Sequence, residues 1–88
     1  MAGQDTLRTR VRNLIVRQLR LEMRPEDLAD DAQLFGGALG LDSIDALELV
    51  VGIEKEFGVS IADQAQGEKA LRSVDTIAQF LAERGVSA

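Results

Sequence analysis

Apolar residues recur at helical spacing in three stretches of the chain, which lie within residues 5–23, 43–57 and 73–84. Each stretch carries an apolar stripe, and an amphipathic helix must bury such a stripe against neighbouring elements. A shorter and weaker helix is expected within residues 59–72. The pattern therefore predicts an all-α fold, an up-and-down four-helix bundle with a short third helix, and residues 1–88 are expected to form a single domain.

The first helix is expected to begin at Asp5 or Thr6 and to run to about Met23. Pro25 limits it, because the residue before a proline is pushed away from helical geometry. Residues 24–42 then form a long connection between helices. Connections of this length tend to be functional, so this segment is a candidate part of a site.

The ends of the later helices have clear sequence signals. Gly58 stands where a left-handed C-cap glycine is expected, so the second helix is predicted to end there. Ser73 is a typical N-cap for the last helix, which is expected to run to about Arg84 before Gly85 ends it.

The chain contains no cysteine and no histidine. A disulfide framework, a thiolate metal site and a cysteine nucleophile are therefore excluded, and the commonest general base is missing. No metal site and no catalytic residues are expected. The polar N-terminus and the short apolar runs predict neither a signal peptide nor a spanning helix, so a cytoplasmic protein without membrane insertion is expected.

Charge is unevenly placed along the chain. Residues 1–24 carry six arginines against two acids, whereas residues 25–68 carry eleven acids against Lys55 alone. Nucleic acid is an unfavourable partner, because the acidic middle would repel it and no aromatic residues are interleaved with the arginines. The arginines are interpreted as a solvated helix face, with docking onto the acidic middle as the less favoured alternative.

The second helix has two opposed apolar faces. The core face consists of Ala46, Leu49, Val50, Ile53 and Phe57. Nearly opposite lies a second set, here called the contact strip, which consists of Ile44, Leu47 and Val51. Either the long connection covers the contact strip, or the strip is exposed and marks an interaction site.

Acidic residues surround or flank the contact strip: Asp42, Asp45, Glu48 and Glu56. Their charge would attract a basic partner surface, and the apolar strip would supply the short-range contact. Gly52 is placed on this acidic flank and interpreted as an unused position, with close approach of a partner's backbone as the less favoured alternative. No other large apolar patch is expected, which favours a monomer.

Ser43 follows a residue that can already cap the second helix, because the carboxylate of Asp42 can accept from the free N–H groups of the first turn. The Ser43 hydroxyl is then spare. A phosphate ester on it would be favoured by the partial positive charge of the helix end. Because Asp42 and Asp45 oppose a freely bound anion, the site better suits a group attached covalently by another enzyme. Without these surroundings, a solvated serine would be the simplest interpretation.

The segment LGLDSIDALELV at residues 39–50, followed by IEKEFGV at residues 53–59, resembles the acyl carrier proteins. The resemblance covers nearly the whole chain, including the long connection and a last helix that begins SVDT at residues 73–76. It implies a carrier with no catalysis of its own. Ser43 would receive 4′-phosphopantetheine from coenzyme A through a phosphopantetheinyl transferase, and the thiol of that arm would hold acyl intermediates as thioesters.

The resemblance also implies roles for the second helix. In the family, this helix recognises the transferase and the enzymes of fatty-acid, lipid or polyketide-type biosynthesis, which include acyl-loading, ketosynthase-type and acyltransferase enzymes. The resemblance assigns this recognition role to six residues of the chain. These are Asp42, Ile44, Asp45, Leu47, Glu48 and Val51. Family members also shelter the acyl chain between helices, which an aliphatic core would permit.

Several features depart from the pattern of a housekeeping fatty-acid carrier. The opening helix is rich in arginine, Gly52 replaces a larger residue, and residues 65–67 make the third-helix region slightly long. These departures favour a specialised carrier for a secondary lipid, polyketide-like or envelope product. The alternatives are a peptidyl-type carrier and an unmodified helical scaffold or regulatory subunit with the same fold.

Overall fold

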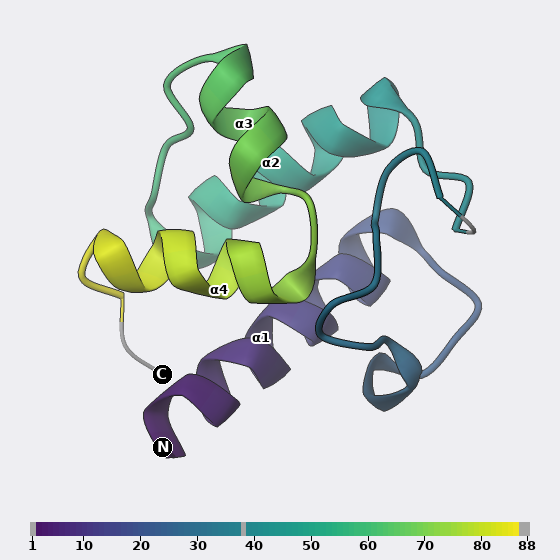
Figure 1. Cartoon of the computed structure of the whole chain (residues 1–88), viewed down its shortest axis with the longest axis horizontal. Coiled ribbons are helices and arrows are strands. Elements are labelled where there is room, and N and C mark those ends of the chain that lie inside the picture. Colours follow the sequence, from purple (N-terminus) through teal and green to yellow (C-terminus); the bar gives the residue numbers. More distant parts are fainter. Residues whose placement is uncertain (1, 38, 87–88) are drawn as a thin grey trace.

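The computed structural model describes residues 2–37 and 39–86, and its regular elements are helices joined by loops (Figure 1). The elements in chain order are α1 (Ala2–Leu19), a short 3-10 helix η1 (Pro25–Asp27), α2 (Ser43–Phe57), α3 (Gln64–Ala70) and α4 (Val74–Glu83). The described residues contain no β-strand, only an isolated bridge between Phe35 and Leu41. The predicted all-α bundle with a short third helix is confirmed.

The core is aliphatic and lies where α1 packs against α2 and α4, while α3 packs against α4. Its largest fully buried side chains come from all three long helices and from the connection before α2. They are Leu14, Ile15, Leu34, Leu49, Ile53, Ile77, Leu81, Val11 and Val74. Full burial of one such side chain stabilises the fold by about 1.5–3 kcal/mol, so these stripes supply much of the driving force.

The limits of α1 differ from the prediction, because the helix begins at Ala2 and ends at Leu19 instead of near Met23. Arg20 has a left-handed backbone, with φ of 54°. The N–H of Leu21 then donates to the carbonyl of Val16 at 3.0 Å, which closes the helix end in the manner of a Schellman motif. The chain thus leaves the helix well before Pro25 could force it to do so.

The other predicted helix ends are confirmed. Gly58 has φ of 70° and donates its N–H to the carbonyl of Glu54 at 2.9 Å, as a left-handed C-cap does. Ser73 caps α4 and forms a reciprocal capping box with Thr76. These local signals fix where α2 and α4 lie along the chain.

The N-terminal half of α1 is tied by ion pairs to the connection and to the start of α4. Arg8 lies 2.9 Å from the carboxylate of Asp75, and Arg12 pairs with Asp30. The backbone N–H of Asp75 also donates to the carbonyl of Asp30 at 2.9 Å. The interpretation of the arginines as a solvated face is wrong for these two residues, because both lie close to carboxylates from distant parts of the sequence.

The opposite side of α1 pairs with the end of α2. Arg10 and Arg17 lie 3.2 and 3.3 Å from the two carboxylate oxygens of Glu56. Here the less favoured alternative, docking of arginines onto the acidic middle of the chain, is what the structure shows. Glu56 therefore faces α1 and is not a free charge beside the contact strip.

Gly52 is buried where α1 crosses α2, so its interpretation as an unused position is wrong. A Cβ atom placed on it would lie only 3.0 Å from the side chain of Gln18. The absence of a side chain therefore allows α1 to approach α2 closely. Gly52 thus contributes to the packing of the two helices because it has no side chain.

Candidate functional site

The first turn of α2 is capped entirely by carboxylates. Asp42 accepts hydrogen bonds from the N–H groups of Ile44 and Asp45 at 3.0 and 3.1 Å. The carboxylate of Asp45 in turn accepts from the N–H of Asp42 at 3.0 Å, which completes a capping box. As the sequence predicts, the helix does not use the hydroxyl of Ser43 as its cap.

Ser43 is the first residue of α2, and its side chain is exposed. Its hydroxyl makes no hydrogen bond to any residue that the structure describes. The hydroxyl therefore has room to accept a group, and the partial positive charge of the helix N-terminus would stabilise a phosphate there. These features fit a covalently attached phosphate ester, as in 4′-phosphopantetheine.

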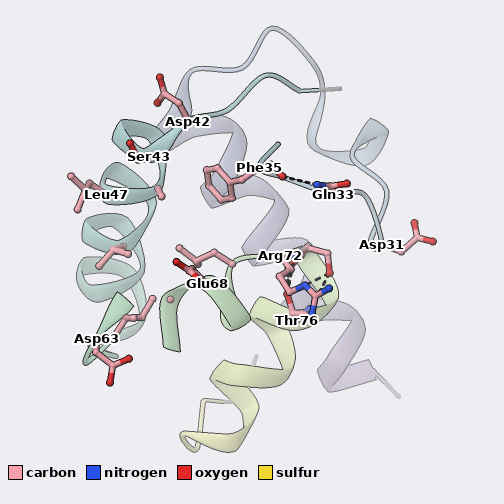
Figure 2. A pocket seen from close by; sticks show the side chains of 16 residues that line it. Asp31, Gln33, Phe35, Asp42, Ser43, Leu47, Asp63, Glu68, Arg72 and Thr76 are labelled. Carbon is pink, nitrogen blue, oxygen red and sulfur yellow. Dashed lines mark hydrogen bonds between the residues drawn. The ribbon is translucent and has the colours of Figure 1, made fainter. Parts of the chain in front are cut away.

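An open groove of about 1210 Å³ begins beside Ser43 (Figure 2). It is walled by the connection before α2, by one side of α2, by the α2–α3 connection, by α3 and by the segment that leads into α4. Its lining residues are Asp31, Gln33, Phe35, Asp42, Ser43, Ala46, Leu47, Val50, Ile61, Asp63, Gly67, Glu68, Leu71, Arg72, Ser73 and Thr76. An arm attached to Ser43 would thus start at the wall of a groove lined by both apolar and polar side chains.

Two hydrogen bonds hold the connection before α2 in place, one through its backbone and one through a side chain. The N–H of Leu34 donates to the carbonyl of Arg72 at 2.9 Å, which joins the connection to the segment between α3 and α4. The side-chain amide of Gln33 donates to the carbonyl of Phe35 at 2.8 Å (Figure 2). These bonds fix the loop wall that carries Phe35.

Sequence reasoning did not identify Phe35, Ile61 and Leu71 as groove residues. They come from three separate segments, so helical periodicity within one element could not bring them together. Periodicity does identify Ala46 and Val50 as part of the core face of α2, and the structure shows that both are half-buried and line the groove.

The contact strip is exposed, with 68% of Ile44, 67% of Leu47 and 42% of Val51 accessible. The alternative in which the long connection covers it is therefore wrong. Leu47 also lines the groove, so the strip and the groove meet along α2. Three side chains of this size left in water are unusual in so small a protein and mark a surface for contact.

The acidic residues assigned to recognition differ in their surroundings. Asp42 and Glu48 are exposed, whereas Asp45 is half-buried and engaged in the cap. All three lie on α2 or at its N-cap, beside the contact strip.

Glu56, the fourth acid near the strip, has a different environment. Its pKa is lowered from the ordinary value of 4.5, because Arg10 first and Arg17 second donate hydrogen bonds to its carboxylate. The charge is thus partly neutralised within the fold. Glu56 stabilises the contact between α1 and α2, and its charge is less available to a partner.

Other kinds of site find no support among the described residues. Their side chains form no group of three or more histidine, cysteine, aspartate or glutamate residues that could hold a metal ion. Within the same part of the chain, no helix is both long and apolar enough to cross a membrane.

Comparison with known proteins agrees with this geometry. The family model described as a phosphopantetheine attachment site matches residues 9–81. The chain is 38% identical over 76 residues to "Acyl carrier protein 3, chloroplastic" of Cuphea lanceolata, which covers 86% of this chain and 47% of that protein. The chain thus spans about half the length of this relative.

Two other relatives match over more of their own length. The acyl carrier protein of Phaeodactylum tricornutum is 40% identical over 62 residues, which are 70% of this chain and 78% of the relative. That of Bradyrhizobium sp. (strain ORS 278) is 37% identical over 78 residues, which are 89% of this chain and 92% of the relative. The family match and these relatives imply a covalently attached 4′-phosphopantetheine group. The chain therefore belongs to the acyl carrier protein family, whose members are carriers rather than enzymes.

Proposed function

We propose that Ser43 is the attachment point of 4′-phosphopantetheine and that the protein delivers acyl groups on this arm to biosynthetic enzymes. The observation that carries the proposal is the exposed Ser43 hydroxyl, which is left free by the Asp42 cap and lies beside the groove. The arm supplies a terminal thiol that holds acyl groups as thioesters. A chain without cysteine has no thiol of its own for this purpose.

Attachment requires a separate phosphopantetheinyl transferase, a partner that the family implies in general terms. The Ser43 oxygen forms a bond to the phosphorus that carries the pantetheine in coenzyme A. The bond from that phosphorus to the bridging oxygen breaks, 3′,5′-ADP leaves, and a base of the transferase takes the hydroxyl proton. The positive end of the α2 dipole favours the phosphodiester that remains on Ser43.

The same face of α2 recognises the partner enzymes. Ile44, Leu47 and Val51 provide exposed apolar area, and the nearby carboxylates of Asp42, Asp45 and Glu48 give the surface a negative potential. A basic patch on an enzyme would be steered toward this surface and then make apolar contact with it. Ketosynthase-type and acyltransferase enzymes are the partner classes proposed.

The pathway served is proposed to be a specialised one, such as the synthesis of a secondary lipid, a polyketide-like compound or an envelope product. The features behind this proposal are the arginine-rich α1 and the glycine at position 52. The test is to load the protein with acyl groups and compare its transfer rates with ketosynthases from fatty-acid and polyketide-type pathways. Faster transfer to the fatty-acid enzyme would contradict a specialised role while leaving the carrier function intact.

A further inference from the structure

We propose that the missing side chain of Gly67 leaves space in the groove and so sets the length of acyl chain that the protein can shelter. The proposal rests on the proposed function, because the occupant is the acylated arm attached to Ser43. Gly67 is buried in α3 and lines the same groove as Ser43. The arm begins on the α2 side, and Gly67 lies in the α3 wall.

The backbone at Gly67 does not require glycine. Its N–H donates to the carbonyl of Asp63 at 3.0 Å, and its own carbonyl accepts from the N–H of Leu71 at 2.9 Å. Gly67 therefore takes part in the ordinary hydrogen bonding of a helix, and its φ is not among the positive values in the protein. Glycine is a poor helix former, so its presence within a seven-residue helix weakens α3.

Close packing does not require glycine either. A Cβ atom at position 67 would have Ile61 Cγ2 as its nearest neighbour, at 3.4 Å, which is an ordinary contact distance. Gly52 is the contrasting case, because a Cβ there would lie 3.0 Å from Gln18 of α1. What glycine provides at position 67 is space beside Ile61, another residue of the groove lining.

The space suits an apolar chain. Ile61 and Leu71 lie on either side of Gly67 in the sequence, and Ala46 and Val50 line the groove from α2. A side chain at position 67 would occupy part of the groove volume that methylene groups of a long acyl chain would fill. Each methylene group excluded in this way would lose its burial from water.

The test compares Gly67→Leu and Gly67→Ala with Ala65→Leu, which adds the same side chain to an exposed position of α3 outside the groove lining. A broad-specificity phosphopantetheinyl transferase loads each protein from acetyl-, hexanoyl-, decanoyl- and hexadecanoyl-coenzyme A. Intact mass verifies loading, and circular dichroism verifies folding. The readouts are the rate at which hydroxylamine cleaves each thioester and the amide chemical shifts of Ile61 and Leu71.

In the parent, long acyl chains should be cleaved more slowly than acetyl and should shift the Ile61 and Leu71 amides. Gly67→Leu should accelerate cleavage of the long chains by about fourfold for each methylene group excluded. Gly67→Ala should have a smaller effect in the same direction, and Ala65→Leu should behave as the parent. If Gly67→Leu does not fold, the comparison of Gly67→Ala with the parent decides.

Unchanged protection in the folded Gly67 variants, or an equal loss in Ala65→Leu, would overturn the role of Gly67. Loading without any dependence on chain length in the parent would also overturn it, while the attachment of the arm at Ser43 would still stand. Absence of loading on the parent would instead be a failure of the proposed function, and the inference would fall with it.

Discussion

Asp42 and Asp45 cap each other across the first turn of α2, each carboxylate accepting the backbone N–H of the other residue at 3.1 and 3.0 Å. These reciprocal bonds cap the N-terminus of the helix without any contribution from the side chain of Ser43. Ser43 is therefore placed at a helix N-terminus with its hydroxyl unused. The side chains of Asp42 and Asp45 thus stabilise the helix end, while the side chain of Ser43 is available for modification.

Replacing Asp42 by alanine should lower the free energy of unfolding by about 1 kcal/mol, because two backbone N–H groups lose their acceptor. Ser43→Ala should change it by less than about 0.5 kcal/mol, since the hydroxyl caps nothing. Urea denaturation of the two variants beside the parent measures both values. A loss in Ser43→Ala as large as that in Asp42→Ala would show that the hydroxyl is part of the cap.

Leu47 and Leu49 lie two residues apart on α2 with opposite surroundings, one exposed and one fully buried. Leu49→Ala should cost about 2–5 kcal/mol of stability, because it leaves a cavity in the core. Leu47→Ala should change stability by less than about 0.5 kcal/mol and yet slow acyl transfer to partner enzymes. Thermal melts and transfer rates measure the two effects, and a Leu47→Ala variant with unchanged transfer would remove the contact strip from recognition.

Glu56 should make the stability of the protein depend on pH. Hydrogen bonds from Arg10 and Arg17 lower the pKa of its carboxyl group in the folded state below the unfolded value. The resulting stabilisation is present above the unfolded pKa, about 4.5, and is lost as the pH falls through the lower folded value.

The test of this prediction is the melting temperature of the parent and of Glu56→Gln from neutral to acidic pH. The parent should melt higher at neutral pH, and the difference should shrink as the pH falls below the unfolded pKa and through the lower folded pKa. Glu48→Gln removes the same charge from an exposed position of α2 and serves as the control. A pH-dependent difference of the same size in Glu48→Gln would attribute the effect to net charge instead of the contact with α1.

Gly52→Leu should lower the free energy of unfolding by about 1–3 kcal/mol, because a side chain there meets Gln18 and pushes α1 away from α2. The matched control is Val51→Leu, which introduces the same side chain at the exposed neighbouring position. Chemical denaturation compares the two variants. Equal stability of both would show that the crossing of α1 over α2 has room to spare.

Local signals explain why most of the fold could be predicted from the sequence. Asp42, Gly58 and Ser73 determine helix ends through bonds to residues within four positions, so their effects are visible in a short window. The two opposed apolar faces of α2 follow from its periodicity in the same way, but only the structure shows that the contact strip is the exposed one. The end of α1 was missed because Arg20 adopts a left-handed backbone that its side chain does not indicate.

The remaining differences come from contacts between distant parts of the chain. Arg10 and Glu56 are 46 positions apart, and nothing in either local pattern identifies the other as a partner. Periodicity places Gly52 on the same side of α2 as Asp45 and Glu56, but only the packing of α1 shows that this side is covered. The groove likewise combines Phe35, Ile61 and Leu71 from separate segments, so its lining required the three-dimensional arrangement.

The central claim is that Ser43 carries the arm, and intact mass spectrometry tests it most directly. The folded protein is incubated with coenzyme A and a phosphopantetheinyl transferase whose activity is verified on another carrier, beside Ser43→Ala. A mass gain of one phosphopantetheinyl group in the parent and none in Ser43→Ala is the predicted result. No gain in the parent, or an equal gain in Ser43→Ala, would contradict the assignment of Ser43.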